Sequence, residues 1–170
     1  MLQTIPAKKV VKKTVKKKVV KTPVDKNQQV IDKALKILEE RLKKPGRGFS
    51  SPGDTKSYLM LKLAELEHEV FSILYLDTRH RLIEYVELFR GTVNGASVHP
   101  REVVKEALKR NAAAVIFAHN HPSGVPEPSE ADKHLTNKLS DALRVLDVRV
   151  LDHIIVGGME TISFSERGLV

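Results

Sequence analysis

Apolar and polar residues follow two different periods along this chain. Over residues 27–44, apolar residues recur every three or four positions, which predicts an amphipathic helix that Pro45 ends. Residues 58–66 repeat the pattern, with Ser51 as the predicted N-cap and Pro52 at the first helical position. Two helices are therefore predicted before residue 69.

Short apolar runs replace the helical period after residue 69. Residues 70–76 and 81–89 predict two strands, joined as a hairpin by the polar segment 77–80. The remaining predicted elements are a helix from 100 to about 111, a strand that starts in the apolar run 112–118, a helix over 129–143 and strands over 148–156 and 161–164. Hairpins mixed with helical crossovers predict an α/β (α+β) sandwich with a mixed sheet, and not a doubly wound one.

The basic charge of the chain lies in its first residues. The net charge is +8, but residues 1–24 hold eight lysines and no acidic residue, which leaves 21 basic and 21 acidic residues in the rest. One interpretation of residues 1–26 is a disordered, solubilising tail, because like charges repel and few apolar residues are present. The other is nucleic-acid contact through residues 8–21, which would release counterions.

Composition limits both the type of metal site and the compartment. The chain has no cysteine, which excludes disulfides and thiolate zinc ligands, so any metal must be held by His, Asp or Glu. No apolar run approaches 18 residues, and the basic N-terminus has no apolar signal-peptide core. A cytoplasmic protein without a membrane partner is expected.

The main candidate functional site lies at the end of the predicted strand that starts in the apolar run 112–118. His119 and His121 stand two residues apart, so on a strand both imidazoles point to one face and can reach one metal ion. A Gly/Pro-rich loop then leads to Ser129 and Asp132. Two imidazoles and a carboxylate predict a zinc site with an open fourth position. Ser129 and Asp132 also match a helix capping box, and both roles are compatible.

Three further polar residues are placed by strand alternation. Asn120 lies between the two histidines and is expected to face away from the metal. Asp152 and His153 lie within an apolar strand on opposite faces, so at most one of them faces the metal side. Each is interpreted either as a buried, hydrogen-bonded polar residue or as support for a ligand histidine.

These residues also carry a resemblance to a known family. His119-x-His121-Pro122, followed after six residues by Ser129-x-x-Asp132, resembles the JAMM (MPN) metalloprotease signature. Further segments resemble its RadC branch: Leu76-Asp77, Phe89-Arg90-Gly91-Thr92, Pro100-Arg101-Glu102, Asn111-Ala112, Ser123-Gly124, Leu151-Asp152-His153 and Ser163-Phe164-x-Glu166-Arg167-Gly168. The resemblance covers roughly residues 50–170. It implies a RadC-type domain over 49–170, of the cytidine-deaminase-like/MPN sandwich type, after an N-terminal helix at 27–48.

The resemblance also implies a mechanism. His119, His121 and Asp132 would bind Zn²⁺, and a zinc-activated water would be the nucleophile. Glu69 would be the general base, with Glu67 as the alternative because the sequence does not fix the strand register. Ser129 would stabilise the oxyanion of the tetrahedral intermediate.

This sequence departs from the family pattern at two places. JAMM proteases usually carry Ser or Thr between the two histidines. This chain has Asn120 at that position, and the RadC branch also has Asn there. Longer RadC proteins have an N-terminal region resembling a helix-hairpin-helix, and a short form without it is expected here.

Three functions are weighed. The leading one is a zinc-dependent metallopeptidase that cleaves a peptide or isopeptide amide in an unknown peptide or protein substrate. The alternative is a DNA-repair-associated or mobile-element accessory protein that binds nucleic acid with little or no catalysis. The third is a pseudoenzyme interaction module. The sequence leaves the substrate and the oligomeric state open.

Overall fold

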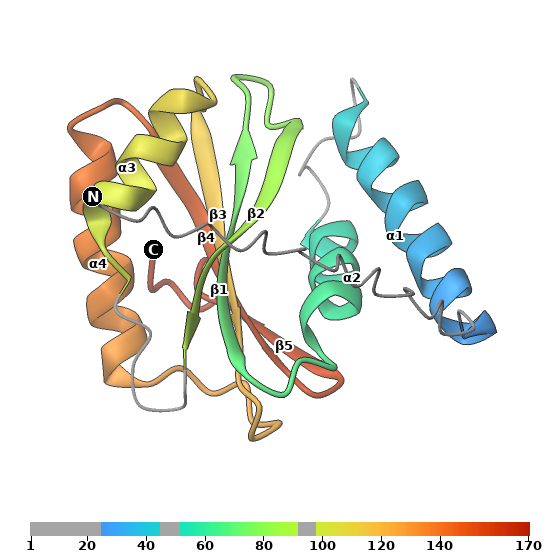
Figure 1. The fold of residues 1–170 in the computed structure, drawn as a ribbon. Helices are drawn as coiled ribbons and strands as arrows, with labels where there is room; N and C mark the ends of the chain where they lie inside the picture. Colours follow the sequence, from blue (N-terminus) through green and yellow to red (C-terminus); the bar gives the residue numbers. More distant parts are fainter. Residues whose placement is uncertain (1–24, 45–51, 92–97) are drawn as a thin grey trace, which may run out of the picture.

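A five-stranded sheet with two helices on each face forms the centre of the molecule (Figure 1). This computed structural model describes residues 25–44, 52–91 and 98–170. Its element order is the predicted α-α-β-β-α-β-α-β-β. The predicted mixed α/β sandwich is therefore confirmed, whereas the tail and the Ser51 N-cap lie outside the described residues.

Two helices cover one face of the sheet. Helix α1 (Lys26–Lys43) is capped by Asp25, whose carboxylate accepts the Asn27 backbone N–H. It packs against α2 (Pro52–Leu63). Within α1, only Leu42 is buried, because α1 lies on the outside of α2 (Figure 1). Polar and charged residues fill most of the rest of its surface, as the amphipathic pattern predicts.

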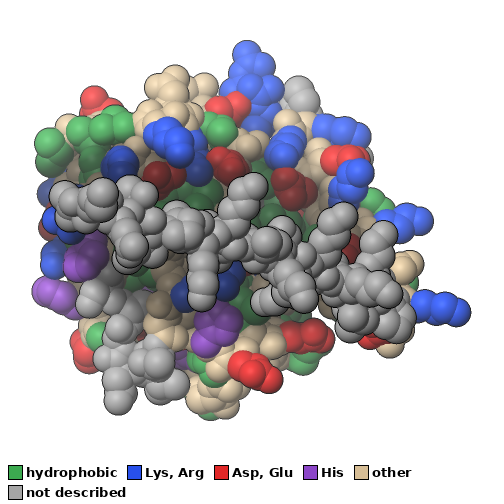
Figure 2. Space-filling view, in the orientation of Figure 1, with side chains coloured by type: hydrophobic (Ala, Val, Ile, Leu, Met, Phe, Trp, Pro, Cys, Tyr) green, Lys and Arg blue, Asp and Glu red, His purple; other side chains and the backbone are tan. Residues whose placement is uncertain are grey.

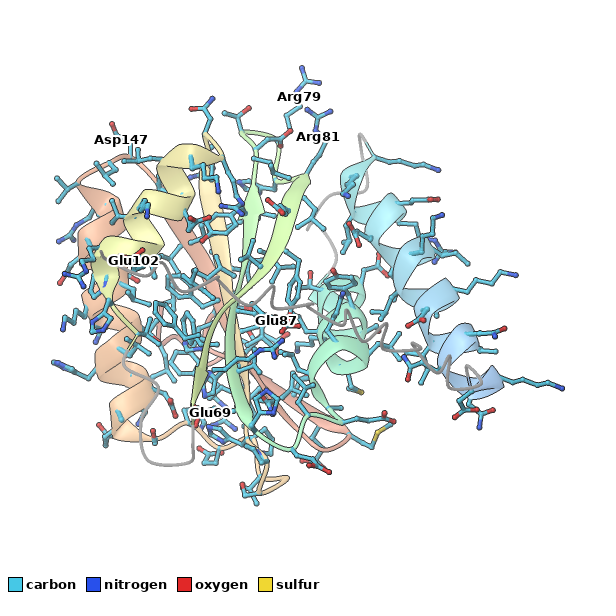
Figure 3. All side chains as sticks on the ribbon, viewed as in Figure 1. Glu69, Arg79, Arg81, Glu87, Glu102 and Asp147 are labelled. Atoms are coloured by element: carbon cyan, nitrogen blue, oxygen red, sulfur yellow. The ribbon has the colours of Figure 1, made fainter. Side chains whose placement is uncertain are left out.

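Strands β1 (Glu69–Leu76) and β2 (Leu82–Gly91) form the predicted antiparallel hairpin. The Asp77 carboxylate fixes the turn by accepting the backbone N–H groups of Arg79 and Arg81, both at 2.9 Å. His80 completes the turn with a φ of 57°, in the left-handed region. The hairpin places Glu69 at the end of the sheet remote from Arg79 and Arg81 (Figure 3).

The strand order is β2-β1-β3-β4-β5. Helix α3 (Pro100–Lys109) leads to β3 (Ala114–Asn120), and α4 (Glu130–Arg144) connects β3 to the parallel strand β4 (Arg149–Gly157). Strand β5 (Glu160–Ser163) closes the sheet in antiparallel pairing with β4. Every residue of β3 is buried, as expected for a central strand with helices on both faces.

Alternation along the strands divides the core in two. On one face, Val70, Leu74 and Ile116 pack with residues of α1 and α2, including Leu42 and Leu59. On the other face, the core contains Phe71, Ile73, Tyr75, Val115 and Phe117 together with Val103 and Ala107 of α3 and Leu139 and Leu143 of α4. The second core leads directly to the histidines, because His119 follows Phe117 at the next position on the same face.

No helix in the described part of the chain is both long and apolar enough to cross a membrane. On the face shown in Figure 2, acidic and basic side chains of the described residues are interspersed. This distribution agrees with the balance of 21 basic and 21 acidic residues after residue 24.

Candidate metal centre

His119 and His121 are held at the end of the sheet by the ladder between β3 and β4. His119 is the partner of Ile155 in this parallel pair, and the backbone N–H of His121 donates to Val156 O at 2.8 Å just beyond β3. His119 is almost fully buried, whereas the His121 side chain is 19% exposed. The pair therefore spans the boundary between the core and solvent.

The N-terminus of α4 delivers the carboxylate. Ser129 is the N-cap and forms the predicted capping box with Asp132. Asp132 Oδ2 accepts both the Ser129 backbone N–H, at 2.8 Å, and the Ser129 hydroxyl, at 2.6 Å. The box thereby fixes the rotamer of Asp132, so the capping interaction also positions the carboxylate next to the two histidines.

The donor atoms of three side chains converge between these elements. His119 Nε2 lies 3.0 Å from His121 Nε2 and 3.3 Å from Asp132 Oδ1, and His121 Nε2 lies 3.7 Å from Asp132 Oδ2. Among the described residues, this is the one group of three or more His, Asp or Glu side chains whose ligand atoms could share a metal ion. Two imidazole nitrogens and one carboxylate oxygen are a donor set used by catalytic zinc sites.

Hydrogen bonding fixes which nitrogen of His121 faces the other donors. Its Nδ1 lies 2.8 Å from the carbonyl oxygen of Val125, and because a carbonyl can only accept, Nδ1 carries the hydrogen. In the neutral ring, the lone pair is then on Nε2 and points at His119 and Asp132. This arrangement favours a cation between the three side chains, so the residues fit a bound metal ion.

The electrostatics of the site lead to the same conclusion. Burial opposes ionisation of Asp132, but the adjacent imidazoles of His119 and His121 and the hydrogen bond from Ser129 hold the pKa of its carboxyl well below the usual range. The adjacent carboxylate of Asp132 raises the pKa of His121 against the effect of burial, and the charge of Glu69 adds to this rise. The site therefore contains a permanent anion that stabilises positive charge on its neighbours.

Strand register determines which glutamate faces the histidines. Phe71 is opposite His119 in the antiparallel pair of β1 and β3, so Glu69, two residues earlier, lies opposite His121 on the same face. Glu69 is half-buried at the start of β1. Glu67 precedes the strand and is exposed. Of the two candidates, Glu69 is the one whose position and face match those of the histidines.

Asn120 lies between the two histidines in the sequence but has different contacts. Its amide is buried, accepts the Val70 N–H at 2.8 Å and donates to Leu66 O at 3.2 Å and His68 O at 3.0 Å. These contacts agree with the expectation that Asn120 faces away from the metal. The sequence did not reveal its actual contacts, because its partners lie about 50 residues earlier in the chain.

The loop between the histidines and α4 is anchored on the β4–β5 turn. A Cβ at Gly157 would lie 2.5 Å from Pro126 N, so this close approach requires glycine. Arg167 adds an ion pair to Glu127 at 2.7 Å. These contacts join the loop that contains Val125 to the end of β4 and to the C-terminal segment.

His153 and Asp152 have separate surroundings. His153 Nε2 lies 2.8 Å from His119 Nδ1, on the metal side, whereas Asp152 holds the turn after β5 by accepting the Ser163 hydroxyl and the Ser165 N–H. At most one of the two was expected on the metal side, and it is His153. The other partner of His153 is Thr136, which the sequence pattern did not indicate, although Thr136 follows Asp132 by four residues and so shares its helix face.

Comparison with known proteins assigns the family. Residues 49–169 match the model of the RadC-like JAB domain. The chain belongs to this family. It is 59% identical over 140 residues to a UPF0758 protein of Vibrio cholerae, an alignment that covers 82% of this chain and 87% of that relative.

Two other relatives of the family are longer than the matched region. A UPF0758 protein of Marinobacter nauticus is 54% identical over 143 residues, which cover 84% of this chain and 63% of the relative. One of Methylibium petroleiphilum is 62% identical over 122 residues, covering 72% and 55% of the two chains. The chain thus spans less than two thirds of these two relatives, and none of the three names states an activity or a ligand.

Proposed function

We propose that this protein is a metal-dependent amide hydrolase of the JAMM type, with Zn²⁺ as its metal and a peptide or isopeptide bond as its substrate. The convergence of His119, His121 and Asp132, with their ligand atoms all within 4.8 Å of one another, is the observation that carries the proposal. Membership of the RadC-like JAB family supports it.

Each residue of the site has a role in this proposal. His119, His121 and Asp132 hold the metal, which when bound acts as a Lewis acid and lowers the pKa of water toward neutrality. Glu69 takes a proton from the attacking water and transfers it to the departing amine nitrogen. Its half-buried position opposite His121, on the same face of the sheet, supports that role.

Ser129 is proposed to donate a hydrogen bond to the oxyanion that forms on the substrate carbonyl. Its hydroxyl donates to Asp132 Oδ2 at 2.6 Å in this structure. An oxyanion role therefore requires the hydroxyl hydrogen to turn away from Asp132 about the Cβ–Oγ bond, while the Ser129 oxygen still accepts the Asp132 N–H and the Ser129 N–H retains its own bond to Asp132. Both roles need a hydroxyl at this position.

The deciding experiment combines metal analysis with turnover in H₂¹⁸O. The protein is stripped with a chelator, reloaded with one equivalent of Zn²⁺ and incubated with a synthetic library of end-blocked hexapeptides, half of them branched through a lysine isopeptide bond. Hydrolysis would place ¹⁸O in a new carboxylate, which mass spectrometry detects. Loss of turnover on stripping and its return on reloading are expected.

His121→Ala is the inactive comparison, because it removes a ligand whose side chain is partly exposed and so disturbs the core little. His134→Ala removes an exposed histidine of α4 outside the group of three and is the matched control. Absence of zinc binding by the wild-type protein would overturn the proposal, as would ¹⁸O incorporation that persists unchanged in His121→Ala.

We propose nucleic-acid binding as a second function, on the basis of the lysines in residues 1–24. Their eight positive charges precede a remainder with equal numbers of basic and acidic residues, so polyanion binding would depend on the tail. Binding of a fluorescent DNA duplex is expected to weaken steeply with salt and to be lost when these lysines are replaced by glutamine. Equal affinity of the two proteins would contradict a role for the tail in DNA binding.

A further inference from the structure

His153 has an environment that determines its charge state. It lies in β4 with no exposed surface, surrounded by the rings of Phe71, Phe117 and Phe164 at centroid distances of 5.7, 5.8 and 4.7 Å. Neither nitrogen of the ring contacts a carboxylate, since their partners are Thr136 and His119, and a buried charge without such a partner is costly. The ring is therefore neutral and carries a single N–H.

Thr136 determines where that hydrogen is. Its hydroxyl donates to the backbone carbonyl of Asp132 at 2.6 Å, and the carbonyl can only accept. The one hydroxyl hydrogen is thus used. Thr136 Oγ1 also lies 2.6 Å from His153 Nδ1, so in this second contact the oxygen accepts and His153 Nδ1 donates. The lone pair of His153 is then on Nε2.

The next contact transfers this constraint to a metal ligand. His153 Nε2 lies 2.8 Å from His119 Nδ1, and because Nε2 has no hydrogen, His119 Nδ1 must donate. The neutral His119 ring then presents the lone pair of its Nε2 toward His121 and Asp132. A single hydrogen-bond direction runs from His119 through His153 and Thr136 to the backbone of Asp132.

We infer that His153 and Thr136 are positioning residues that fix the tautomer of His119 and join it to the helix turn that carries Asp132. We call the hydrogen-bonded chain from His119 through His153 and Thr136 to Asp132 O the relay. It links two of the three proposed ligands, and neither His153 nor Thr136 hydrogen-bonds to the third, His121. His121 has its own acceptor, Val125 O, so the two imidazoles are oriented independently. The inference rests on the proposed metal site and extends it to residues outside the His-x-His and Ser-x-x-Asp motifs.

A hydrogen bond to the outer nitrogen of a ligand histidine typically contributes 10–100-fold to metal affinity. Thr136→Val replaces the hydroxyl with a methyl group of similar shape, which removes the acceptor for His153 Nδ1 and frees His153 to adopt the other tautomer. Thr136→Ser retains the hydroxyl and is the matched control. Both variants keep a small side chain at this buried position.

Two measurements on the full chain test the relay. In the metal-free protein, long-range ¹H–¹⁵N spectra of the imidazoles are expected to show His153 and His119 with the hydrogen on Nδ1. Zinc competition against a chelating dye is expected to give a dissociation constant about 10-fold or more higher for Thr136→Val. The value for Thr136→Ser should stay within about twofold of wild type.

The outcomes separate the relay from the metal proposal. An Nε2–H tautomer of His153 would overturn the relay, as would unchanged zinc affinity in a Thr136→Val protein that unfolds at the wild-type temperature. The expected tautomers in a wild-type protein that binds no zinc would support the relay and refute the metal site. Thermal unfolding of each variant shows whether a change in zinc affinity reflects loss of the fold.

Discussion

The side-chain oxygen of Asn120 accepts the backbone N–H of Val70 at 2.8 Å. This bond joins the strand that carries the histidines to the first residues of β1, where Glu69 lies. Asn120 donates its two amide hydrogens to Leu66 O and His68 O. One buried side chain therefore fixes the backbone on both sides of Glu69. A Ser or Thr at this position has one hydroxyl hydrogen and could not make both donations.

Asn120→Ala is expected to lower the free energy of unfolding by about 1–3 kcal/mol, because it leaves the Val70 N–H buried without a partner. It should lower turnover more than zinc affinity, since the three metal donors are untouched while Glu69 loses its support. Chemical denaturation and chelator competition measure the two effects. Asn137→Ala, on the exposed face of α4, is the control and should be neutral or slightly stabilising. Equal losses of turnover and zinc affinity would argue against this role.

Glu69→Gln is expected to retain zinc and to lose turnover by roughly 100-fold or more, because the amide has the shape of the carboxylate but cannot accept the proton. Glu67→Gln should remain close to wild type, since Glu67 is exposed before β1 begins. Steady-state hydrolysis and metal content of both variants test the assignment. The reverse pattern would make Glu67 the base, and wild-type turnover in both would leave neither residue in that role.

Asp132→Asn is expected to abolish stabilisation by zinc, because it removes the one anionic donor of the group. For the wild-type protein, zinc at about 100 times its dissociation constant should add about 2.7 kcal/mol to the free energy of unfolding. Thermal unfolding with and without zinc measures the difference. Asp141→Asn, on the exposed surface of the same helix, should respond to zinc as the wild type does. An equal response of Asp132→Asn would exclude Asp132 as a ligand.

Zinc affinity is expected to increase with pH. The adjacent carboxylate of Asp132 raises the pKa of His121 above its ordinary 6.5, so protonated His121 stabilises the metal-free fold at low pH, and this contribution is lost as the pH rises through the raised value. Zinc must displace that proton, so its affinity should fall by up to about tenfold per pH unit below the raised pKa. Titrations at about pH 6, 7 and 8 measure it, and a flat profile would contradict the proton release.

The order of the elements could be predicted because the signals that define it are local. Each helix shows its apolar period within its own residues, and the Ser129–Asp132 capping box spans only one turn. The pairing of His119 and His121 on one face likewise follows from the two-residue period of a strand. Local chemistry thus predicted the elements, the α/β class and the three proposed ligands.

Contacts between distant segments could not be predicted in this way. Glu69 lies opposite His121 only because β1 and β3 pair in a register that places Phe71 against His119. A shift of one residue would turn Glu69 to the other face of the sheet. Asn120 reaches its partners across about 50 residues, and the hydrogen on His119 depends on Thr136 and His153 from two other elements.

The sequence by itself therefore determined which residues could bind a metal, because ligand type and spacing are properties of short segments. Only the tertiary structure decided which glutamate approaches the histidines, what Asn120 holds and how His119 is oriented. Those outcomes depend on strand register and on the directions of buried hydrogen bonds. Both are set when separate segments pack together, because each buried donor then needs an acceptor.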